Sequence, residues 1–151
     1  MKFDKSNLNI FLFFKLPSAW FTGVRVTAIT ENICEVRVKH RWISQNPFNS
    51  LYFAVQAMAA ELTTGVIVMR AIARSGKKIS MLVAQNKSEF TKKARGKITF
   101  KCTDIELVNK AIRDTIETGE GQTFWMSSDG VDQQGDLVSK FSFEWTIKVK
   151  S

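Results

Sequence analysis

Apolar and polar residues alternate along several segments of the chain, and this period of two predicts β-strands. In residues 34–42 the even positions are mostly apolar, whereas the odd positions from Glu35 to Arg41 are charged. Such alternation indicates a strand with one buried and one solvated face. The same period occurs, in places weakly, in residues 24–28, 78–90, 97–102, 122–128 and 141–149. The polar segment 127–136 predicts a hairpin loop before the last strand.

Three other segments have apolar residues at helical spacing: 4–15, roughly 50–74, and 104–118. The segment 104–118 has one apolar face, and Gly119 is placed to end it. The segment 50–74 is apolar around most of its circumference, so a helix there must be enclosed on most sides. We therefore expect a single α+β domain over residues 1–151. A curved antiparallel sheet of about five or six strands would wrap the long helix, with the N-terminal helix and the helix 104–118 at its periphery.

The polar residues of the long helix are unevenly placed. At 100° per residue, Gln56, Thr63, Arg70 and Arg74 fall in one narrow stripe, and Glu61 lies on the opposite side. The residues around Glu61 are mostly small, and no Lys or Arg stands three or four positions away to pair with it. A buried unpaired charge costs several kcal/mol or shifts its pKa until it is neutral.

Two interpretations of Glu61 remain open from the residues alone. In the first, a distant strand supplies a partner, or the helix turn is open to water. In the second, Glu61 lines a pocket formed by small side chains, and its pKa is raised into the range useful for acid–base catalysis. The second interpretation predicts a functional site on the long helix.

The composition limits the classes of site and partner. Cys34 and Cys102 are too few for a disulfide framework, and with His40 as the single histidine we expect no metal site. No run reaches the length of a membrane span, and the apolar run 8–14 lacks the features of a signal peptide, so we expect a cytoplasmic protein. The net charge of +8 favours an anionic partner, whether nucleic acid, a membrane surface or a phosphate-bearing cofactor.

The segment 46–61 resembles the signature of the hotdog-fold acyl-CoA thioesterases of the phenylacetate-degradation type. That family has Asn-Pro-x-Gly-x-x-His-Gly-Gly at the entry to its long helix, and an acid fifteen residues after the Asn. Asn46 and Pro47 match this pattern, and Glu61 stands fifteen residues after Asn46. Residues 16–47 are similar to the first hairpin of the family and its run into the helix. Residues 86–102 are similar to an element that lies near the coenzyme A phosphates.

The resemblance implies hydrolysis of an acyl thioester, with coenzyme A as part of the substrate and no separate cofactor. Glu61 would act as general base or nucleophile, and Asn46 would position water or the thioester. The backbone amides of Phe53 and Ala54 at the helix start would form the oxyanion hole. The residues implied near the substrate or coenzyme A are Ser50, Tyr52, Thr64, Lys92, Lys93, Arg95 and Lys97.

One departure from the family motif motivates an alternative function. Tyr52, Phe53 and Ala54 stand where the family has His-Gly-Gly, and Asn49 replaces its other glycine. The chain then resembles an uncharacterised group of bacterial hotdog proteins as much as the defined thioesterases. The alternatives are a non-catalytic module that binds acyl-CoA or another amphipathic ligand, and a basic domain that binds nucleic acid, for which no specific motif is present. The resemblance also implies a homodimer, or a dimer of dimers, with sites at the subunit interface.

Overall fold

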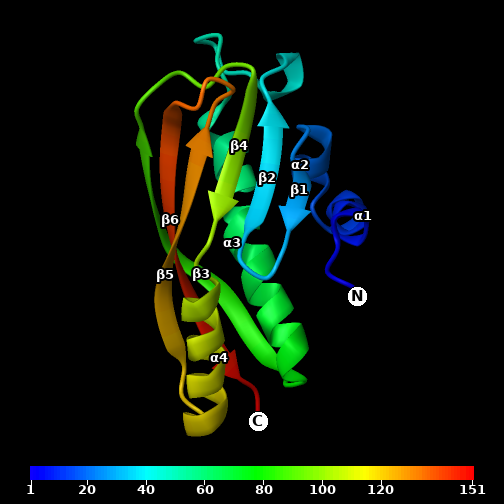
Figure 1. The fold of residues 1–151 in the computed structure, drawn as a ribbon, viewed down its shortest axis with the longest axis vertical. Coiled ribbons are helices and arrows are strands. Elements are labelled where there is room, and N and C mark those ends of the chain that lie inside the picture. The colour runs from blue at the N-terminus through cyan, green and yellow to red at the C-terminus, as the bar shows by residue number, and fades with distance from the viewer.

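A six-stranded antiparallel sheet forms one layer of the protein (Figure 1), in a computed structural model that describes residues 1–151. The strands lie in the order β1-β2-β4-β5-β6-β3, so β1 and β3 are the two edges. Their bounds are Arg25–Ile29 for β1, Cys34–Lys39 for β2, Ile79–Phe90 for β3, Lys97–Cys102 for β4, Gln122–Val131 for β5 and Leu137–Val149 for β6. All predicted strands are therefore present.

The long helix α3, Phe53–Ser75, runs along the concave side of this sheet and contacts four of its strands. A curved antiparallel sheet around one long helix is the hotdog architecture that the resemblance implies, so that expectation is confirmed. By length and composition α3 could also cross a membrane, but 67% of its most apolar window is buried inside the protein. It is the core helix of this fold.

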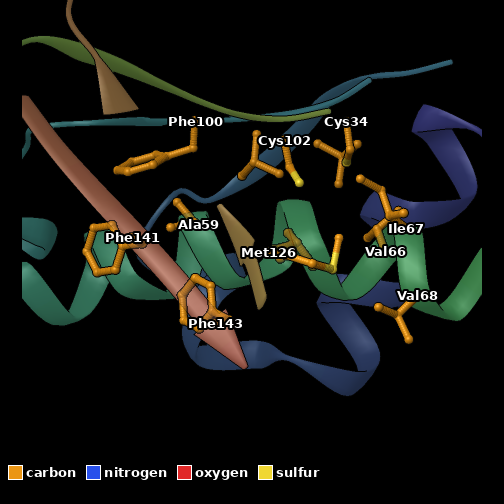
Figure 2. Close-up of a cluster of buried hydrophobic side chains, with 14 of the residues drawn as sticks. Cys34, Ala59, Val66, Ile67, Val68, Phe100, Cys102, Met126, Phe141 and Phe143 are labelled. Carbon is orange, nitrogen blue, oxygen red and sulfur yellow. The ribbon is translucent and has the colours of Figure 1, made fainter. Parts of the chain in front are cut away.

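The core lies between α3 and the inner face of the sheet. Figure 2 shows Phe100, Phe141 and Phe143 from the strands facing Ala59 and the following turns of α3. The Phe141 and Phe143 rings are stacked, with centroids 6.0 Å apart and planes within 7°. Small residues on the helix leave room for these large rings, so helix and sheet approach closely.

The polar stripe of α3 faces the sheet and not the solvent. This differs from the usual arrangement, in which the polar side of a helix is exposed. Gln56, Thr63 and Arg70 are all buried. Each side chain makes one hydrogen bond to the surrounding fold: Thr63 Oγ1 lies 2.9 Å from Ser128 Oγ, Arg70 Nη1 donates to the Thr30 carbonyl at 2.7 Å, and Gln56 Nε2 donates to the Leu51 carbonyl at 3.1 Å. Gln56 Oε1 and Arg70 Nη2 have no partner. Hydrogen bonding offsets part of the cost of burying these side chains. The face that carries Glu61 lies on another side of α3, toward α1, β3 and β6.

Two N-terminal helices cover the open side of α3 and the β1 edge. The helix α1, Lys5–Lys15, is the predicted N-terminal helix, and Asp4 caps it by accepting a hydrogen bond from the Asn7 amide at 2.9 Å. The side chain of Asn9 binds the outer edge of β1 at one residue. Its Nδ2 donates to the Val26 carbonyl at 2.9 Å, and its Oδ1 accepts from the Val26 amide at 3.0 Å.

Local differences from the expected elements have simple causes. A short helix α2, Pro17–Phe21, was not predicted; it starts at a proline, which favours the first helical position. The strand β2 ends at Lys39, and a 3₁₀ turn, Trp42–Ser44, follows. The helix α4, Ile105–Thr118, matches its prediction and ends at Gly119, whose φ is +76°.

The hairpin between β5 and β6 is tighter than the polar segment 127–136 suggests. The strand β5 continues to Val131, and β6 already starts at Leu137. The turn itself is held by Asp132, whose Oδ1 accepts hydrogen bonds from the amides of Gln134 and Asp136 at 3.0 Å each. Pairing across the sheet outweighs the local turn preference of these residues.

Candidate functional site

Glu61 lies in the middle of α3 and lines a small cavity of about 220 Å³. The walls of this cavity are mostly apolar and come from four elements: Phe11 and Lys15 of α1 with the adjoining Leu16, Leu62, Gly65 and Met69 of α3, Met81 of β3, and Trp145 of β6. The cover over Glu61 is thus the N-terminal helix, which sequence reasoning did not place there. No residue spacing within α3 indicates which distant segment covers this face.

The carboxylate of Glu61 has no ion pair or hydrogen-bond partner. Burial alone raises the pKa of this carboxyl group above its ordinary value. Lys15 lines the same cavity, but its ammonium is exposed and does not pair with Glu61. A carboxyl group in such surroundings holds its proton more tightly than a surface acid does.

Gly65 and Trp145 shape the wall beside the carboxylate. A Cβ atom at Gly65 would lie 3.3 Å from Glu61 Oε1 and 3.5 Å from the Trp145 ring, so glycine leaves the space that the carboxylate uses. The indole Nε1 of Trp145 donates to Thr64 Oγ1 at 3.0 Å, and that hydroxyl donates to the Glu61 carbonyl at 2.8 Å. Thr64 is fully buried, and its contacts join α3 to β6.

A second cavity, of about 690 Å³, lies at the start of α3. Its lining residues are Asn46, Pro47, Phe48, Ser50, Leu51, Tyr52, Phe53, Gln56, Phe90, Thr91, Lys92, Lys93 and Ala94. We call it the helix-start cavity. It contains the matched Asn-Pro dipeptide and most of the residues that the resemblance places near the substrate. Glu61 does not line it.

Asn46 organises the loop that leads into α3. Its Oδ1 accepts hydrogen bonds from the Phe48 amide at 3.0 Å, the Ser50 amide at 3.2 Å and the Ser50 hydroxyl at 3.1 Å. Asn49 in this loop has a φ of +57°, a conformation that asparagine tolerates better than most residues. In this structure Asn46 and Ser50 therefore hold the loop, and the oxygen of Asn46 is fully engaged.

The first amides of α3 are available to a ligand. Tyr52 caps the helix without a side-chain hydrogen bond, and the amides of Phe53 and Ala54 have no acceptor within the chain. Free amides at a helix start carry partial positive charge and can bind an oxyanion. The Phe53 ring is 55% exposed and contacts the Tyr52 and Phe90 rings, so the cavity has an aromatic rim.

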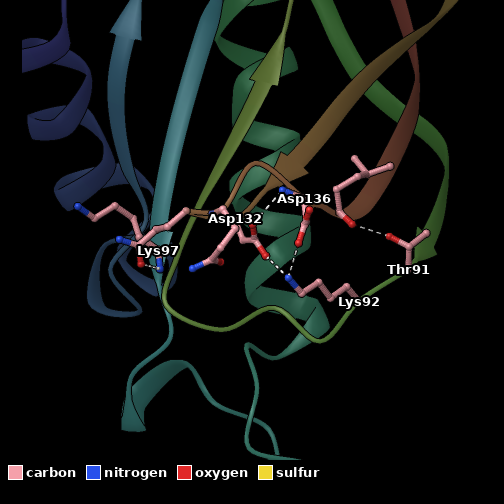
Figure 3. A network of polar contacts seen from close by, with 8 residues as sticks. Thr91, Lys92, Lys97, Asp132 and Asp136 are labelled. Atoms are coloured by element: carbon pink, nitrogen blue, oxygen red, sulfur yellow. Dashed lines mark hydrogen bonds and ion pairs between the residues drawn. The ribbon is translucent and has the colours of Figure 1, made fainter.

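The residues of the predicted basic cluster have different environments (Figure 3). The Lys92 ammonium is already paired with Asp132 at 2.6 Å and Asp136 at 2.7 Å, and these carboxylates raise its pKa. The Lys93 ammonium lies 3.5 Å from the Phe48 carbonyl, and Arg95 Nε donates to the Asn49 carbonyl at 3.1 Å. These two cations therefore stand beside the helix-start loop without a carboxylate partner.

Lys97 lies at the start of β4, directly opposite Lys39 of β2. Its backbone amide donates to Gln133 Oε1 at 3.2 Å, while its side chain is exposed and unpaired. Two lysines at one sheet position repel each other, which favours a bound anion there. No cluster of His, Cys, Asp and Glu side chains able to hold a metal ion is present.

Glu61 and the helix-start cavity are separated along the helix. Glu61 follows Phe53 by eight positions, which is about 12 Å at the rise of an α-helix. One strand borders both places: Met81, near the start of β3, lines the Glu61 cavity, and Phe90, at its end, lines the helix-start cavity. One protomer thus presents the acid and the free amides at opposite ends of one edge strand.

Comparison with known proteins gives a family and a fold. The sequence profile of a domain of unknown function, DUF4442, matches residues 5–147. No curated protein sequence matches the chain significantly.

Several solved structures have the same fold. One is a Pseudomonas aeruginosa protein described as a probable thioesterase, with TM-score 0.80, 17% identity, and 96% of each chain covered. A Chlorobaculum tepidum protein of unknown function has TM-score 0.82 and 13% identity over 97% of this chain and 94% of its own. A Haemophilus influenzae thioesterase has TM-score 0.73 and 15% identity over 99% of this chain and 93% of its own. At such identities the likeness establishes the hotdog fold.

Proposed function

Since the chain belongs to the DUF4442 family and has a hotdog fold that it shares with thioesterases, we propose that it hydrolyses acyl-CoA thioesters. The observation that carries this proposal is Glu61: a carboxyl group without a partner, in an apolar cavity, with its pKa raised by burial. Glu61 is half-buried, so its charge is partly desolvated, and no partner in the chain compensates for this. A general base needs such an environment.

The proposed reaction uses water and leaves no group on the protein at its end. Glu61 takes a proton from water while the water oxygen attacks the thioester carbonyl carbon. The carbon–sulfur bond then breaks, and the coenzyme A thiolate takes up the proton. In the other form of the mechanism, Glu61 attacks the carbonyl carbon itself, and water hydrolyses the resulting anhydride. Both forms need hydrogen-bond donors for the carbonyl oxygen, and the amides of Phe53 and Ala54 are suited to this.

We propose that the acid and the amides come from different protomers of a homodimer. The outer edge of β3 is unpaired, and Leu82 on this strand is 66% exposed. If β3 pairs antiparallel with its copy about a two-fold axis, the end of one strand lies beside the start of the other. The helix-start cavity of one protomer, at Phe90, then adjoins the Glu61 cavity of the other, at Met81. This arrangement closes the gap of about 12 Å between the groups.

The coenzyme A part of the substrate would lie at the helix-start cavity. Lys93 and Arg95 stand beside its loop without carboxylate partners and would attract the phosphates. Lys97 would contribute through its exposed ammonium. We give Lys92 a smaller role, because Asp132 and Asp136 neutralise its charge.

Replacement of Glu61 tests the chemistry. Glu61→Gln keeps the shape of the side chain and removes the base, so we expect kcat with acyl-CoA substrates to fall by about 10²–10⁴-fold. The matched control is Glu106→Gln on the exposed face of α4, which should retain full activity. A panel of acyl-CoA esters from short to long chains, measured through release of free thiol, identifies the substrate class. Full activity in Glu61→Gln would falsify the proposed role.

The amide donors can be tested by a single proline. Phe53 is the first residue of α3, where proline is tolerated, and Tyr52 before it already has the extended backbone that proline requires (φ −62°, ψ 137°). Phe53→Pro removes one amide donor, and we expect kcat to fall by about 10²-fold. Phe53→Ala removes the same ring but keeps the amide, so it separates the effect of the donor from that of the side chain.

Mixing two inactive variants tests the shared site. Heterodimers of Glu61→Gln and Phe53→Pro contain one site with both native groups, so co-expression should restore about a quarter of wild-type activity in a randomly assorted dimer. A site contained within one protomer would show no restoration, because every protomer would then lack one essential group.

A non-catalytic module that binds acyl-CoA is the second candidate function. The observation that favours it is the aromatic rim of Tyr52, Phe53 and Phe90, which stands where the family motif has a histidine and two glycines. Calorimetry with coenzyme A and with a non-hydrolysable acyl-CoA analogue would show binding in either case. Binding without turnover across the panel of esters identifies the module, and absence of both rejects both candidates.

A further inference from the structure

The two N-terminal helices expose a continuous aromatic surface. Phe14 is 71% exposed and Phe21 62%, and Ile10 and Phe13 are also exposed. The Phe13 ring joins them, with centroids 5.0 Å from Phe14, 5.5 Å from Trp20 and 6.4 Å from Phe21. We call this surface, formed by Ile10, Phe13, Phe14, Trp20 and Phe21, the N-terminal patch. A contiguous apolar patch of this kind marks a contact site, because scattered apolar residues do not cluster in this way.

The patch is not needed for the internal packing of α1. Leu8 and Leu12 supply the buried face of this helix. On a helical wheel Ile10 and Phe14 lie roughly opposite them, at about 180°. The helix is therefore apolar on two sides, and only one of them faces the protein. Figure 1 shows α1 and α2 at the side of the molecule that lies beyond the β1 edge.

Positive charge surrounds the patch. Two exposed lysines, Lys5 and Lys15, stand at the two ends of α1, and the guanidinium of Arg25 stacks over the Trp20 ring at 3.4 Å from its centroid. Arg41 reaches the Gly23 backbone just after α2. Asp4 is the only acid in residues 1–30, and it is engaged in capping α1. An aromatic surface with a cationic border matches the interface of an anionic bilayer, where rings enter the headgroup region and lysines meet phosphates.

We propose that the N-terminal patch docks the protein on anionic lipid membranes. Charge argues against a second copy of the chain as the occupant. A two-fold contact through this surface would bring Lys5, Lys15 and Arg25 of each protomer toward the same cations of the other. The β3 edge, which we assign to the dimer, lies at the other end of the strand order from β1. The outward rings of Phe14 and Phe21 do not line the Glu61 cavity, where that dimer would place the partner.

Docking has a consequence for access to Glu61. Phe11 and Lys15 of α1 line the Glu61 cavity, and they also line the shallow surface hollow formed with Ile10 and Phe14. A membrane bound at the patch therefore lies against the helix that covers the cavity. This part of the inference rests on the proposed thioesterase function, whereas the docking itself does not.

Vesicle sedimentation tests the docking. The wild-type protein should bind phosphatidylcholine vesicles that contain about one-third phosphatidylglycerol, and bind pure phosphatidylcholine far less. Phe14→Ser/Phe21→Ser leaves the net charge unchanged and should weaken binding to the anionic vesicles at least about tenfold. The matched control, Leu107→Ser/Ile116→Ser, removes two exposed apolar residues from α4 and should bind as the wild type does.

Three outcomes would overturn the proposal. Wild-type protein that stays in solution with anionic vesicles is one. Equal binding of the patch variant and the wild type is another, and it would assign the attraction to basic residues elsewhere, such as Lys93 and Arg95. The third is a patch variant whose mass in solution is half that of the wild type, which would show that a second copy covers the patch. Thermal unfolding confirms that each variant is folded, and thioester hydrolysis without vesicles reports separately on the proposed function.

Discussion

Glu61 is the one acid of α3, and its environment opposes its charge. Burial raises its pKa in the folded protein, so the folded state holds the proton more tightly than the unfolded chain does. The free energy of unfolding therefore decreases as the pH rises from the ordinary carboxyl pKa of about 4.3 through the higher pKa of the folded state. The proposed catalytic role would account for an acid at a position that disfavours its charge.

This cost predicts a pH-dependent stability difference. At pH 8 the melting temperature of Glu61→Gln should exceed that of the wild type by about 2–4 °C, because the variant carries no buried charge. At pH 3, below the ordinary carboxyl pKa of about 4.3, the group is largely protonated in both states, and the difference in melting temperature should nearly close. Calorimetric melts at both values check this. Glu106→Gln, an exposed change in the first turn of α4, should not raise the melting temperature at either pH.

The contact between Thr63 and Ser128 predicts a coupled pair. Both residues are fully buried, and their hydroxyl oxygens lie 2.9 Å apart. Thr63→Val leaves the Ser128 hydroxyl without a partner and should lower the free energy of unfolding by about 1–3 kcal/mol. The double variant Thr63→Val/Ser128→Ala should lose less than the sum of the two single changes. Urea denaturation of all four proteins measures this coupling, and strict additivity would contradict it.

At the scale of single residues, the sequence predicted that Glu61 has no partner on its own helix, but it did not predict which residues surround it. Spacing within the helix shows that no cation of α3 can reach the acid. Spacing cannot show that α1 and Trp145 of β6 complete the cavity, because those contacts depend on the path of the whole chain. Helical spacing also separates Glu61 correctly from the polar stripe. It does not show that the stripe faces the sheet, because that contact too depends on the path of the whole chain.

Gly130 explains why β5 extends through a segment that has the composition of a turn. A Cβ atom there would lie 2.6 Å from the Phe100 ring and 2.9 Å from Ser139 Oγ, so only glycine lets β5 pass this close to β4 and β6. Local turn chemistry predicted a loop of ten residues, 127–136. Strand pairing reduced it to the short turn around Asp132.

This close approach predicts different costs for two glycine substitutions. Gly130→Ala must displace the Phe100 ring in a packed core and should lower the free energy of unfolding by about 1–3 kcal/mol. Gly121→Ala is the matched control, since its new methyl group would meet only the Ile147 carbonyl at an ordinary 3.6 Å. Phe100→Leu should reduce the cost of Gly130→Ala when the two are combined. Equal melting temperatures for the two alanine variants would contradict the steric explanation.

The architecture of the whole molecule followed from the sequence because two periods alternate cleanly along it. The strand spacing, together with one long helix that is polar only along a narrow stripe, leaves few ways to bury the apolar surface. The arrangement of the candidate site could be predicted less completely from the sequence. Asn46 and Glu61 belong to one motif, in which the acid follows the Asn by fifteen positions. The structure nevertheless places the two residues in separate cavities. A motif records neighbours along the chain, whereas a site formed by two chains depends on the assembly.

The prediction for the whole molecule concerns its oligomeric state, which we propose to be a dimer. Light scattering should report about twice the 17.1 kDa mass of one chain. Leu82→Lys places a cation on the exposed face of β3 in both protomers, so it should weaken the dimer and reduce thioesterase activity together. Leu107→Lys on α4 adds the same charge at another exposed leucine and should leave both unchanged. A wild-type protein that stays monomeric at all concentrations would rule out the shared site.

The bidentate contact of Asn9 with Val26 limits how far such pairing can continue. Its side-chain amide uses the same donor and acceptor pattern as a neighbouring strand, so it occupies the position where another chain would add to β1. With one edge occupied and the other open, the proposed association through β3 would stop at two chains. In that dimer, a single asparagine side chain would make the growth of this sheet self-limiting.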